Sequence, residues 1–236
     1  MQFACGPGWE ISPDARGFSQ QRCIISGLEL PAFYPILDTA VLGRAGLDLL
    51  QAGRSLLEAG ARILQLRHKG HFSRELFEVA GEMAAACREA GALFVVNDRA
   101  DMAALLGCAL HLGQEDLRPL EARTILPRPA VIGFSTHNEA QIRAAAEEPV
   151  DYLAFGPIFA TGSKENPDPV TGLAGLRRIR GLTRRPLVAI GGVTLENAGQ
   201  VLAAGADSVA VISGFLPELR SGAVGRWVEL ERGSKG

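Results

Sequence analysis

Two short apolar runs end in carboxylates and amides, side chains that bind hard metal ions. The first run ends in Asn97 and Asp98, and the second is followed by a polar cluster that contains Asp116. Carboxylate oxygens, phosphate oxygens and water together form the oxygen-rich shell that Mg²⁺ prefers. Each aspartate alone could simply cap the helix that follows it, a role that aspartate performs well. Because both follow successive strand-like runs, the pattern favours a site for Mg²⁺.

Basic and amide side chains mark the end of another apolar run. Gln65, Arg67 and Lys69 are spaced two residues apart, so they share one side of an extended chain. Three polar groups on one face are costly to bury unless a ligand or water meets them. Arg67 and Lys69 carry positive charge suited to a diphosphate, and Gln65 can donate to and accept from a heterocycle. A solvated chain end would explain Lys69 alone but explains the three together less well.

A third polar segment is a loop long enough to cover a site. Residues 162–172 are dominated by glycine, proline and asparagine, and Thr161, Ser163 and Lys164 offer hydroxyls and a charge to phosphate. The alternative is a flexible surface loop with incidental polar residues. Further along, the Gly-Gly pair at residues 191–192 would allow a ligand to approach the backbone closely, although such a pair also simply turns a chain.

One of the four histidines is a candidate catalytic residue, and the other three are expected to be core or loop residues. His137 follows an apolar run in the segment GFSTH, where it could act as an acid or base, or equally cap or pack at a helix start. His111 lies within an apolar run and is expected to be a hydrogen-bonded core histidine. His68 and His71 have the surroundings of loop residues.

These polar segments alternate with helical stretches in a pattern typical of an α/β protein. Short apolar runs, each followed by residues of helical period, recur eight times. The predicted strands are Ala32–Asp38, Ile63–Arg67, Leu93–Asn97, Ala109–Leu112, Val131–Ser135, Tyr152–Gly156, Leu187–Ile190 and Ser208–Ile212. Eight alternations favour a single (β/α)₈ TIM barrel over residues 31–231. Because active sites of such barrels lie at the carboxyl ends of the strands, the polar groups should converge there.

The composition excludes several classes of partner. Of the 236 residues, 47% are hydrophobic and 21% charged, as in a globular protein with a sizeable core. The net charge of −2 provides no basic field for nucleic acid or an anionic membrane. No apolar run approaches the roughly 20 residues that span a bilayer, and the first residues do not resemble a secretory signal. We therefore expect a cytoplasmic protein that binds small molecules, and the pattern indicates no particular oligomeric state.

The chain ends and the cysteines suggest no further site. Residues 1–30 show no sustained period and are expected to be an extension, which could form an extra strand, a plug under the barrel floor or a loosely ordered segment. Residues 232–236 are expected to fray. The four cysteines include no C-x-x-C pair, which predicts reduced thiols, with Cys87 and Cys108 in the core.

Taken in order, the motifs resemble those of the thiamine-phosphate synthase family, also called thiamine-phosphate pyrophosphorylase. The similar segments are QLRHK, VVND, HLGQED, GFSTH, GPIFATGSK, AIGGVTLEN and AGADSVAVIS, and they extend from about residue 31 to 215. The resemblance implies a transferase that joins 4-amino-2-methyl-5-hydroxymethylpyrimidine diphosphate to hydroxyethylthiazole phosphate, forming thiamine phosphate and releasing diphosphate. The implied chemistry is dissociative, assisted by Mg²⁺.

The resemblance also implies roles for individual residues. The residues implied to hold the pyrimidine diphosphate or the departing diphosphate are Gln65, Arg67, Lys69, Asn97, Ser135 and Lys164, of which Arg67, Lys69, Ser135 and Lys164 are the catalytic candidates. Asp98 and Asp116 would bind Mg²⁺. The residues implied to seat the thiazole phosphate are Thr161, Gly162, Ser163, Gly192, Ile212 and Ser213.

The sequence departs from the family pattern at two motifs. The connection GCALH is one residue shorter than the usual GADGVH, and it should lie on the barrel floor, where it affects packing more than catalysis. The loop reads TGSK where TxTK is usual, but Ser163 keeps the hydroxyl.

Two other functions are compatible with the same barrel. A thiazole tautomerase would use His137 as acid or base, and a non-catalytic barrel would bind a thiamine precursor without turnover. The intact QxRxK and GQED segments favour the synthase, because a tautomerase has no diphosphate to neutralise and a binding protein needs no metal pair.

Overall fold

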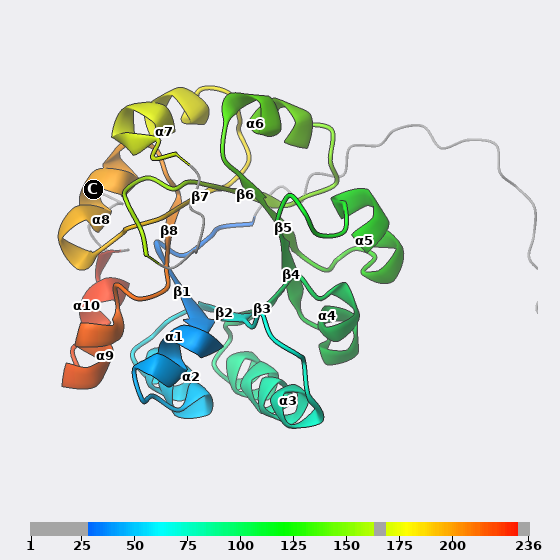
Figure 1. Ribbon diagram of the computed structural model, residues 1–236, viewed down its shortest axis with the longest axis vertical. Coiled ribbons are helices and arrows are strands. Elements are labelled where there is room, and N and C mark those ends of the chain that lie inside the picture. The colour runs from blue at the N-terminus through cyan, green and yellow to red at the C-terminus, as the bar shows by residue number, and fades with distance from the viewer. Residues whose placement is uncertain (1–27, 163–168, 231–236) are drawn as a thin grey trace, which may run out of the picture.

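The computed structural model of the chain describes residues 28–162 and 169–230. Its strands close into one parallel barrel in chain order, with the helices arranged around it (Figure 1). The strands are β1 (Phe33–Asp38), β2 (Ile63–Arg67), β3 (Leu93–Asn97), β4 (Ala109–Leu112), β5 (Ile132–Thr136), β6 (Tyr152–Phe155), β7 (Leu187–Ile190) and β8 (Ser208–Val211). The predicted (β/α)₈ barrel is confirmed.

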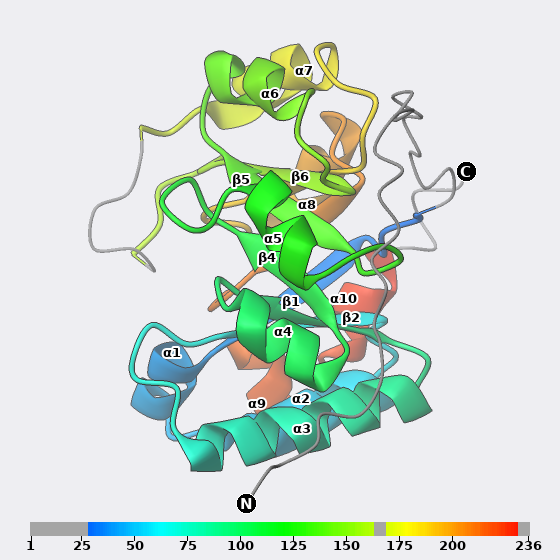
Figure 2. The same cartoon turned by 90° about the vertical axis from the view of Figure 1, so that its right-hand side faces the viewer.

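The helices connect successive strands and cover the outside of the barrel. They are α1 (Thr39–Arg44), α2 (Leu49–Glu58), α3 (Arg74–Glu89), α4 (Ala100–Leu106), α5 (Pro119–Ile125), α6 (Glu139–Ala145), α7 (Gly172–Arg180), α8 (Leu195–Ala203), α9 (Leu216–Ser221) and α10 (Gly225–Val228). In the side view, α2 and α3 lie next to each other along one flank (Figure 2). None of the helices in the described ranges is long and apolar enough to cross a membrane.

The ends of the strands differ from the predicted ends by no more than one residue. β6 ends at Phe155, because the chain then reaches Pro157, which has no N–H to donate to a strand ladder. β5 is shifted by one residue relative to the prediction, since its ladder with β6 extends to the pair Thr136 and Phe155. Pairing with a neighbouring strand, which the apolar pattern does not reveal, therefore sets the last residue of each strand.

Apolar side chains form two layers on opposite faces of the strands. Alternate residues of each strand point into the barrel and outward toward the helices. The interior layer consists of Tyr34, Ile36, Ile63, Val95, Ala109, Tyr152, Ala154, Val188 and Ala210. Leu28 and Leu30 pack against this layer just before β1. The barrel is thus a packed core with its polar residues confined to the ends of the strands and to a few interior positions.

The cysteines and the chain ends add little to the site. Cys87 is buried and Cys108 is half-buried, and both are free thiols whose pKa burial raises to about 12. Cys87 therefore lies in the core as predicted, and Cys108 lies at its margin. The predicted tail of residues 232–236 falls outside the described residues, as does all of the predicted extension before residue 28.

A buried ion-pair cluster fixes the amino-terminal end of the barrel, away from the polar strand ends. Asp151, directly before β6, accepts from Arg123 at 2.6 Å and from Arg128 at 2.9 Å. Its Oδ2 also accepts the N–H of Ile132, at the start of β5, at 2.7 Å. The side chain of Asp151 is 2% exposed, so removal of this carboxylate would leave two guanidinium groups without their counter-charge.

We predict that Asp151→Ala lowers the free energy of unfolding by about 3 to 5 kcal/mol, because removing one member of a buried ion pair leaves the opposite charges without a partner. Glu82→Ala is the matched control, since Glu82 pairs with Arg54 at 3.7 Å with both side chains 58% exposed, and such pairs contribute about 1 kcal/mol or less. Urea unfolding monitored by circular dichroism measures both values. Equal losses in the two variants would contradict this account.

Candidate active site at the carboxyl ends of the strands

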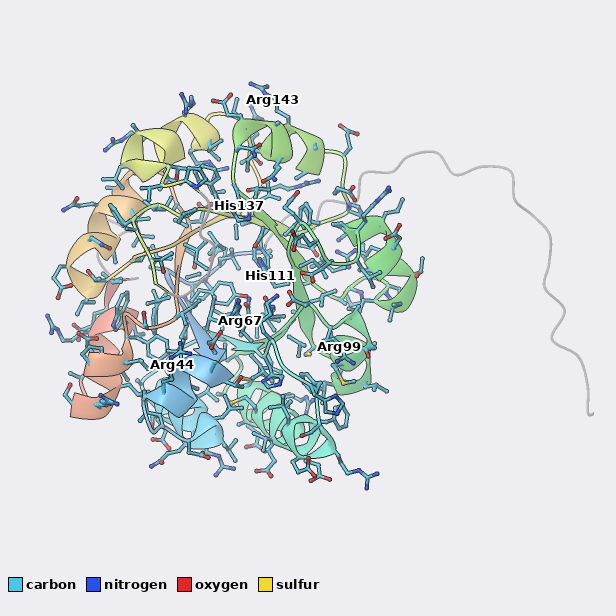
Figure 3. The ribbon with its side chains drawn as sticks, in the orientation of Figure 1. Arg44, Arg67, Arg99, His111, His137 and Arg143 are labelled. Carbon is cyan, nitrogen blue, oxygen red and sulfur yellow. The ribbon has the colours of Figure 1, made fainter. Side chains whose placement is uncertain are left out.

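Closure of the barrel brings polar side chains from several strands to one rim. Viewed down the barrel, Arg67, His111 and His137 lie within the ring of strands, whereas Arg44 and Arg143 lie over the outer helices (Figure 3). These three inner residues come from β2, β4 and the end of β5, which are far apart in sequence. The rim divides into an ionic half, around β1 to β5, and a small pocket between β6, β7 and β8.

The ionic half contains the two predicted metal ligands side by side. The carboxylate of Asp98, directly after β3, lies close enough to that of Asp116 for the two to interact, and it also forms an ion pair with Lys69. Asp116 accepts the N–H of Gly113 at 2.7 Å, which fixes it in the loop after β4. Burial, with a further contribution from Asp116, raises the pKa of Asp98 to about 6, against the opposing effect of Lys69.

The backbone at Asp98 indicates that its position is enforced. Asp98 has a φ of 66°, the left-handed conformation that non-glycine residues rarely adopt, and it is the one such residue in the described ranges. Its N–H donates to the carbonyl of His111 at 2.8 Å, which ties the turn to β4. Strain of this kind persists where the surrounding structure over-determines it, commonly at functional sites.

The donor set fits a hard divalent cation that is also bound by a ligand. Asp98 and Asp116 supply oxygen atoms only, and a cation between them would relieve their like-charge contact. No group of three or more His, Cys, Asp or Glu residues gathers in the part of the chain that the structure describes. Two protein carboxylates leave coordination positions for phosphate oxygens and water, as is usual for Mg²⁺.

Asp38 is a site residue that the sequence analysis missed. It ends β1 and is 4% exposed, and its Oδ2 forms an ion pair with Arg67 at the end of β2. Its Oδ1 accepts the N–H of Val41 at 2.9 Å and so caps α1. Asp38 thus orients Arg67 over the rim, and the remaining guanidinium N–H groups can still reach an anion. An aspartate at the end of an apolar run was the available signal, the same one that identified Asp98.

Beneath the rim, five polar side chains form one hydrogen-bonded chain across the barrel interior. Gln65 donates to the hydroxyl of Tyr34 at 2.8 Å, and this hydroxyl lies 2.9 Å from that of Tyr152. The Tyr152 hydroxyl lies 3.0 Å from Nδ1 of His111, whose Nε2 lies 2.9 Å from Oγ of Ser135. The prediction that His111 is a hydrogen-bonded core histidine is confirmed. Gln65, Arg67 and Lys69 are predicted to share one side of the chain. They lie at different depths in the barrel, because Gln65 is buried and Lys69 is exposed.

The other half of the rim is a pocket lined mainly by glycines and by apolar side chains. About 590 Å³ of space is free of protein atoms there, part of it open to solvent. Four of the residues predicted to bind a phosphate line it, namely Thr161, Gly192, Ile212 and Ser213. Gly192 has a φ of 62°, and a Cβ atom there would lie 2.5 Å from the carbonyl oxygen of Ala160. Only glycine permits this close approach.

His137 lies at the edge of the same pocket. Its ring Nδ1 is 2.7 Å from the carbonyl oxygen of Gly156, so this nitrogen carries the hydrogen and donates. Its backbone N–H donates to Gln141 in α6 at 2.6 Å. His137 is therefore oriented by two hydrogen bonds at the start of the segment that leads to α6, as a capping or packing residue would be, while its ring also contacts the pocket.

The remaining predicted residues lie at the rim or outside the described ranges. Asn97 ends β3 and is buried beside Asp98. Gly162 follows Thr161 at the last described position before the gap, and Ser163 and Lys164 lie outside the described residues. His68 and His71 occupy the loop after β2, as predicted, where Nδ1 of His68 is 2.7 Å from Oγ1 of Thr39.

Comparison with known proteins identifies the family. The sequence model described as "Thiamine monophosphate synthase" matches residues 33–215, which include every strand of the barrel and its rim. The chain belongs to this family. The segments that resemble the synthase family span nearly the same residues, from about 31 to 215, so the predicted family is confirmed.

Individual members of the family cover most of the chain. The thiamine-phosphate synthase of Koribacter versatilis is 46% identical over 83% of this chain and 93% of its own length. That of Methanoregula boonei is 44% identical over 76% of this chain and 83% of its own length. Among solved structures, the thiamine phosphate pyrophosphorylase of Pyrococcus furiosus superposes with a TM-score of 0.76 at 32% identity, covering 86% of this chain and 96% of that one.

The buried position of His111 predicts a specific dependence of stability on pH. Burial lowers its pKa from 6.5 to about 4. As the pH falls below 6.5 the unfolded chain takes up a proton that the folded chain takes up only near pH 4, so the stabilising contribution is complete above pH 6.5 and is lost toward pH 4. We expect wild type to lose about 3 kcal/mol of unfolding free energy relative to His111→Gln across this window. Denaturant unfolding at several pH values measures the difference, and a constant difference would contradict the assignment.

Proposed function

We propose that this chain is a thiamine-phosphate synthase that joins 4-amino-2-methyl-5-hydroxymethylpyrimidine diphosphate to hydroxyethylthiazole phosphate, with Mg²⁺ as its metal. The observation that carries the proposal is the contact of Asp98 with both Asp116 and Lys69 at one rim of the barrel. Membership of the thiamine monophosphate synthase family supports the same activity. The substrates are small phosphorylated molecules, in keeping with a rim that has an ionic half and a separate pocket.

In this proposal Asp98 and Asp116 hold the metal. When bound, Mg²⁺ supplies positive charge to the diphosphate leaving group. Lys69 contacts Asp98, so its ammonium group lies where it can meet the same diphosphate. Arg67, oriented by Asp38, adds a planar fork of donors that suits phosphate oxygens. Lys164, which follows β6 in the sequence and lies outside the described residues, would add a further charge.

The reaction needs charge stabilisation more than proton transfer. The bond between the pyrimidine methylene carbon and the diphosphate oxygen breaks, and its electron pair leaves on the diphosphate. The lone pair of the thiazole nitrogen then forms the new C–N bond, and no proton has to be removed from that nitrogen. The task of the protein is therefore to neutralise the departing diphosphate and to exclude water from the pyrimidine cation.

Two groups of residues would bind the two substrates. Gln65 within β2, Asn97 at the end of β3 and Ser135 near the end of β5 would hold the pyrimidine next to the ionic half of the rim. The residues that seat the thiazole phosphate are Thr161, Gly162, Ser163, Gly192, Ile212 and Ser213. This division is supported by the composition of the pocket, in which glycine backbone and hydroxyl groups suit a phosphate monoester.

The direct test is synthesis by the purified full chain with each component omitted in turn. We expect thiamine phosphate only when both substrates and Mg²⁺ are present. Asp98→Ala and Lys69→Ala should each lower kcat by roughly a hundredfold or more, because charge stabilisation of the leaving group is the main catalytic contribution. Asp101→Ala is the control, since Asp101 is an exposed carboxylate on α4 that pairs with Arg99.

The outcomes separate the proposal from the two alternative functions. Retained synthesis in both variants would contradict the metal and diphosphate assignments. Conversion of the thiazole substrate alone, lost in His137→Ala, would identify a tautomerase. Binding of both substrates by wild type without any product would identify a non-catalytic binding protein.

A second prediction concerns the thiazole pocket. Gly192→Ala should raise the KM for the thiazole phosphate by roughly tenfold, a loss of about 1.4 kcal/mol of binding, because the added methyl group displaces the backbone at Ala160. Gly46→Ala is the matched control: Gly46 has a φ of 66°, and a Cβ there would meet nothing within 4 Å. Both variants carry the same backbone strain, so an equal change in KM would contradict the assignment of the pocket.

A further inference from the structure

The hydrogen-bonded chain inside the barrel connects two residues that the proposed function uses with three that it does not. Gln65 and Ser135 are at its ends, and Tyr34, Tyr152 and His111 lie between them. Tyr34 and Tyr152 are the only two tyrosines in the sequence, and both are at most 1% exposed. These three central side chains come from β1, β6 and β4, so the series of hydrogen bonds crosses the barrel directly beneath the rim.

The direction of every hydrogen bond in this chain follows from its first donor. The amide nitrogen of Gln65 donates to the Tyr34 hydroxyl, which therefore accepts from Gln65. The single hydrogen of Tyr34 is then directed to the Tyr152 hydroxyl, 2.9 Å away. Tyr152 accepts that bond and directs its own hydrogen to Nδ1 of His111. Reversal at either tyrosine would place two hydrogens, or none, between one pair of oxygens.

His111 continues the same direction of hydrogen-bond donation to Ser135. The imidazole is neutral in this arrangement, because its Nδ1 accepts the hydrogen of the Tyr152 hydroxyl and so carries none of its own. A neutral imidazole that accepts at Nδ1 carries its hydrogen on Nε2. The Nε2–H group then donates to Oγ of Ser135 at 2.9 Å, so the hydroxyl hydrogen of Ser135 is not used inside the barrel. Ser135 is half-buried at the end of β5 and can direct this hydrogen toward a ligand.

We propose that Tyr34, Tyr152 and His111 are positioning residues that make Ser135 a hydrogen-bond donor toward the pyrimidine substrate. This inference rests on the proposed function for the identity of that substrate. The site would then select an acceptor atom at Ser135, such as a ring nitrogen of the pyrimidine, and disfavour a group that can only donate. If His111 instead carried its hydrogen on Nδ1, Nε2 would accept the hydroxyl hydrogen of Ser135. That hydrogen would then not be available to a ligand.

The tautomer of His111 tests the polarity directly. In the ligand-free full chain with ¹⁵N-labelled histidine, two-dimensional NMR at pH 7.5 distinguishes a hydrogen on Nε2 from one on Nδ1. The chain contains four histidines, and the signal that disappears in His111→Gln identifies His111. We expect the Nε2–H form. A hydrogen on Nδ1, or on both nitrogens, would overturn the inference whatever the enzyme's activity.

Removal of one link tests the effect on the substrate. Tyr152→Phe keeps the aromatic ring but removes the donor to Nδ1, so His111 can take the other tautomer and accept from Ser135. We expect the KM for the pyrimidine diphosphate to rise roughly tenfold, the value of one well-placed hydrogen bond, while the KM for the thiazole phosphate changes by less than about twofold. The His111 signal should shift toward Nδ1–H in the same variant. Equal changes in both KM values, or no change in the tautomer, would contradict a positioning role.

Thr136→Val is the matched control. Thr136 neighbours Ser135 on β5, is fully buried and donates to the carbonyl of Ala154 at 2.7 Å, outside the chain of five. Its variant should lose stability without a change in either KM or in the His111 tautomer. Should Tyr152→Phe not fold, Tyr34→Phe removes the preceding link, and the same split between the two KM values is expected. Wild type that forms no thiamine phosphate would defeat the proposed function, and the tautomer measurement would still decide the polarity.

Discussion

Closure of the eight-stranded parallel sheet is the constraint on which the site depends. The strands pair in chain order from β1 to β8, and β8 pairs back with β1, so every strand delivers its carboxyl end to one rim. Asp38 and Arg67 form an ion pair there although they end separate strands. Opening the β1–β2 ladder would separate Asp38 from Arg67, and opening the β2–β3 ladder would separate Lys69 from Asp98. The buried cluster around Asp151 stabilises the opposite end of the same cylinder.

The barrel interior carries polar groups where an ordinary core would be apolar. Gln65, Tyr34, Tyr152 and His111 satisfy one another, so their burial does not leave unpaired donors or acceptors. A fully connected network of this kind is rigid, and a low dielectric strengthens each bond within it. The rim therefore rests on a polar floor whose hydrogen-bond directions are defined, rather than on side chains that are free to turn.

Local sequence patterns predicted the barrel and part of the site, because short apolar runs with polar ends are a direct consequence of buried parallel strands. Asp98 and Asp116 were predicted to meet for the same reason, and they do. The partner of Arg67 was not predicted, because the pairing with Asp38 follows from the register of β1 against β2. The contact between Tyr34 and Tyr152 joins residues 118 positions apart across the barrel, so no local pattern could reveal it.

Locating the metal and the diphosphate in a crystal would show whether the two carboxylates and Arg67 form one site. Crystals of the full chain soaked with inorganic diphosphate and Mn²⁺, a stand-in for Mg²⁺, would locate the metal by anomalous scattering. We expect one peak within coordination distance of the Asp98 and Asp116 carboxylates, with the diphosphate between the metal and Arg67. A peak elsewhere, or a diphosphate bound away from these side chains, would contradict a single site for the metal and the leaving group.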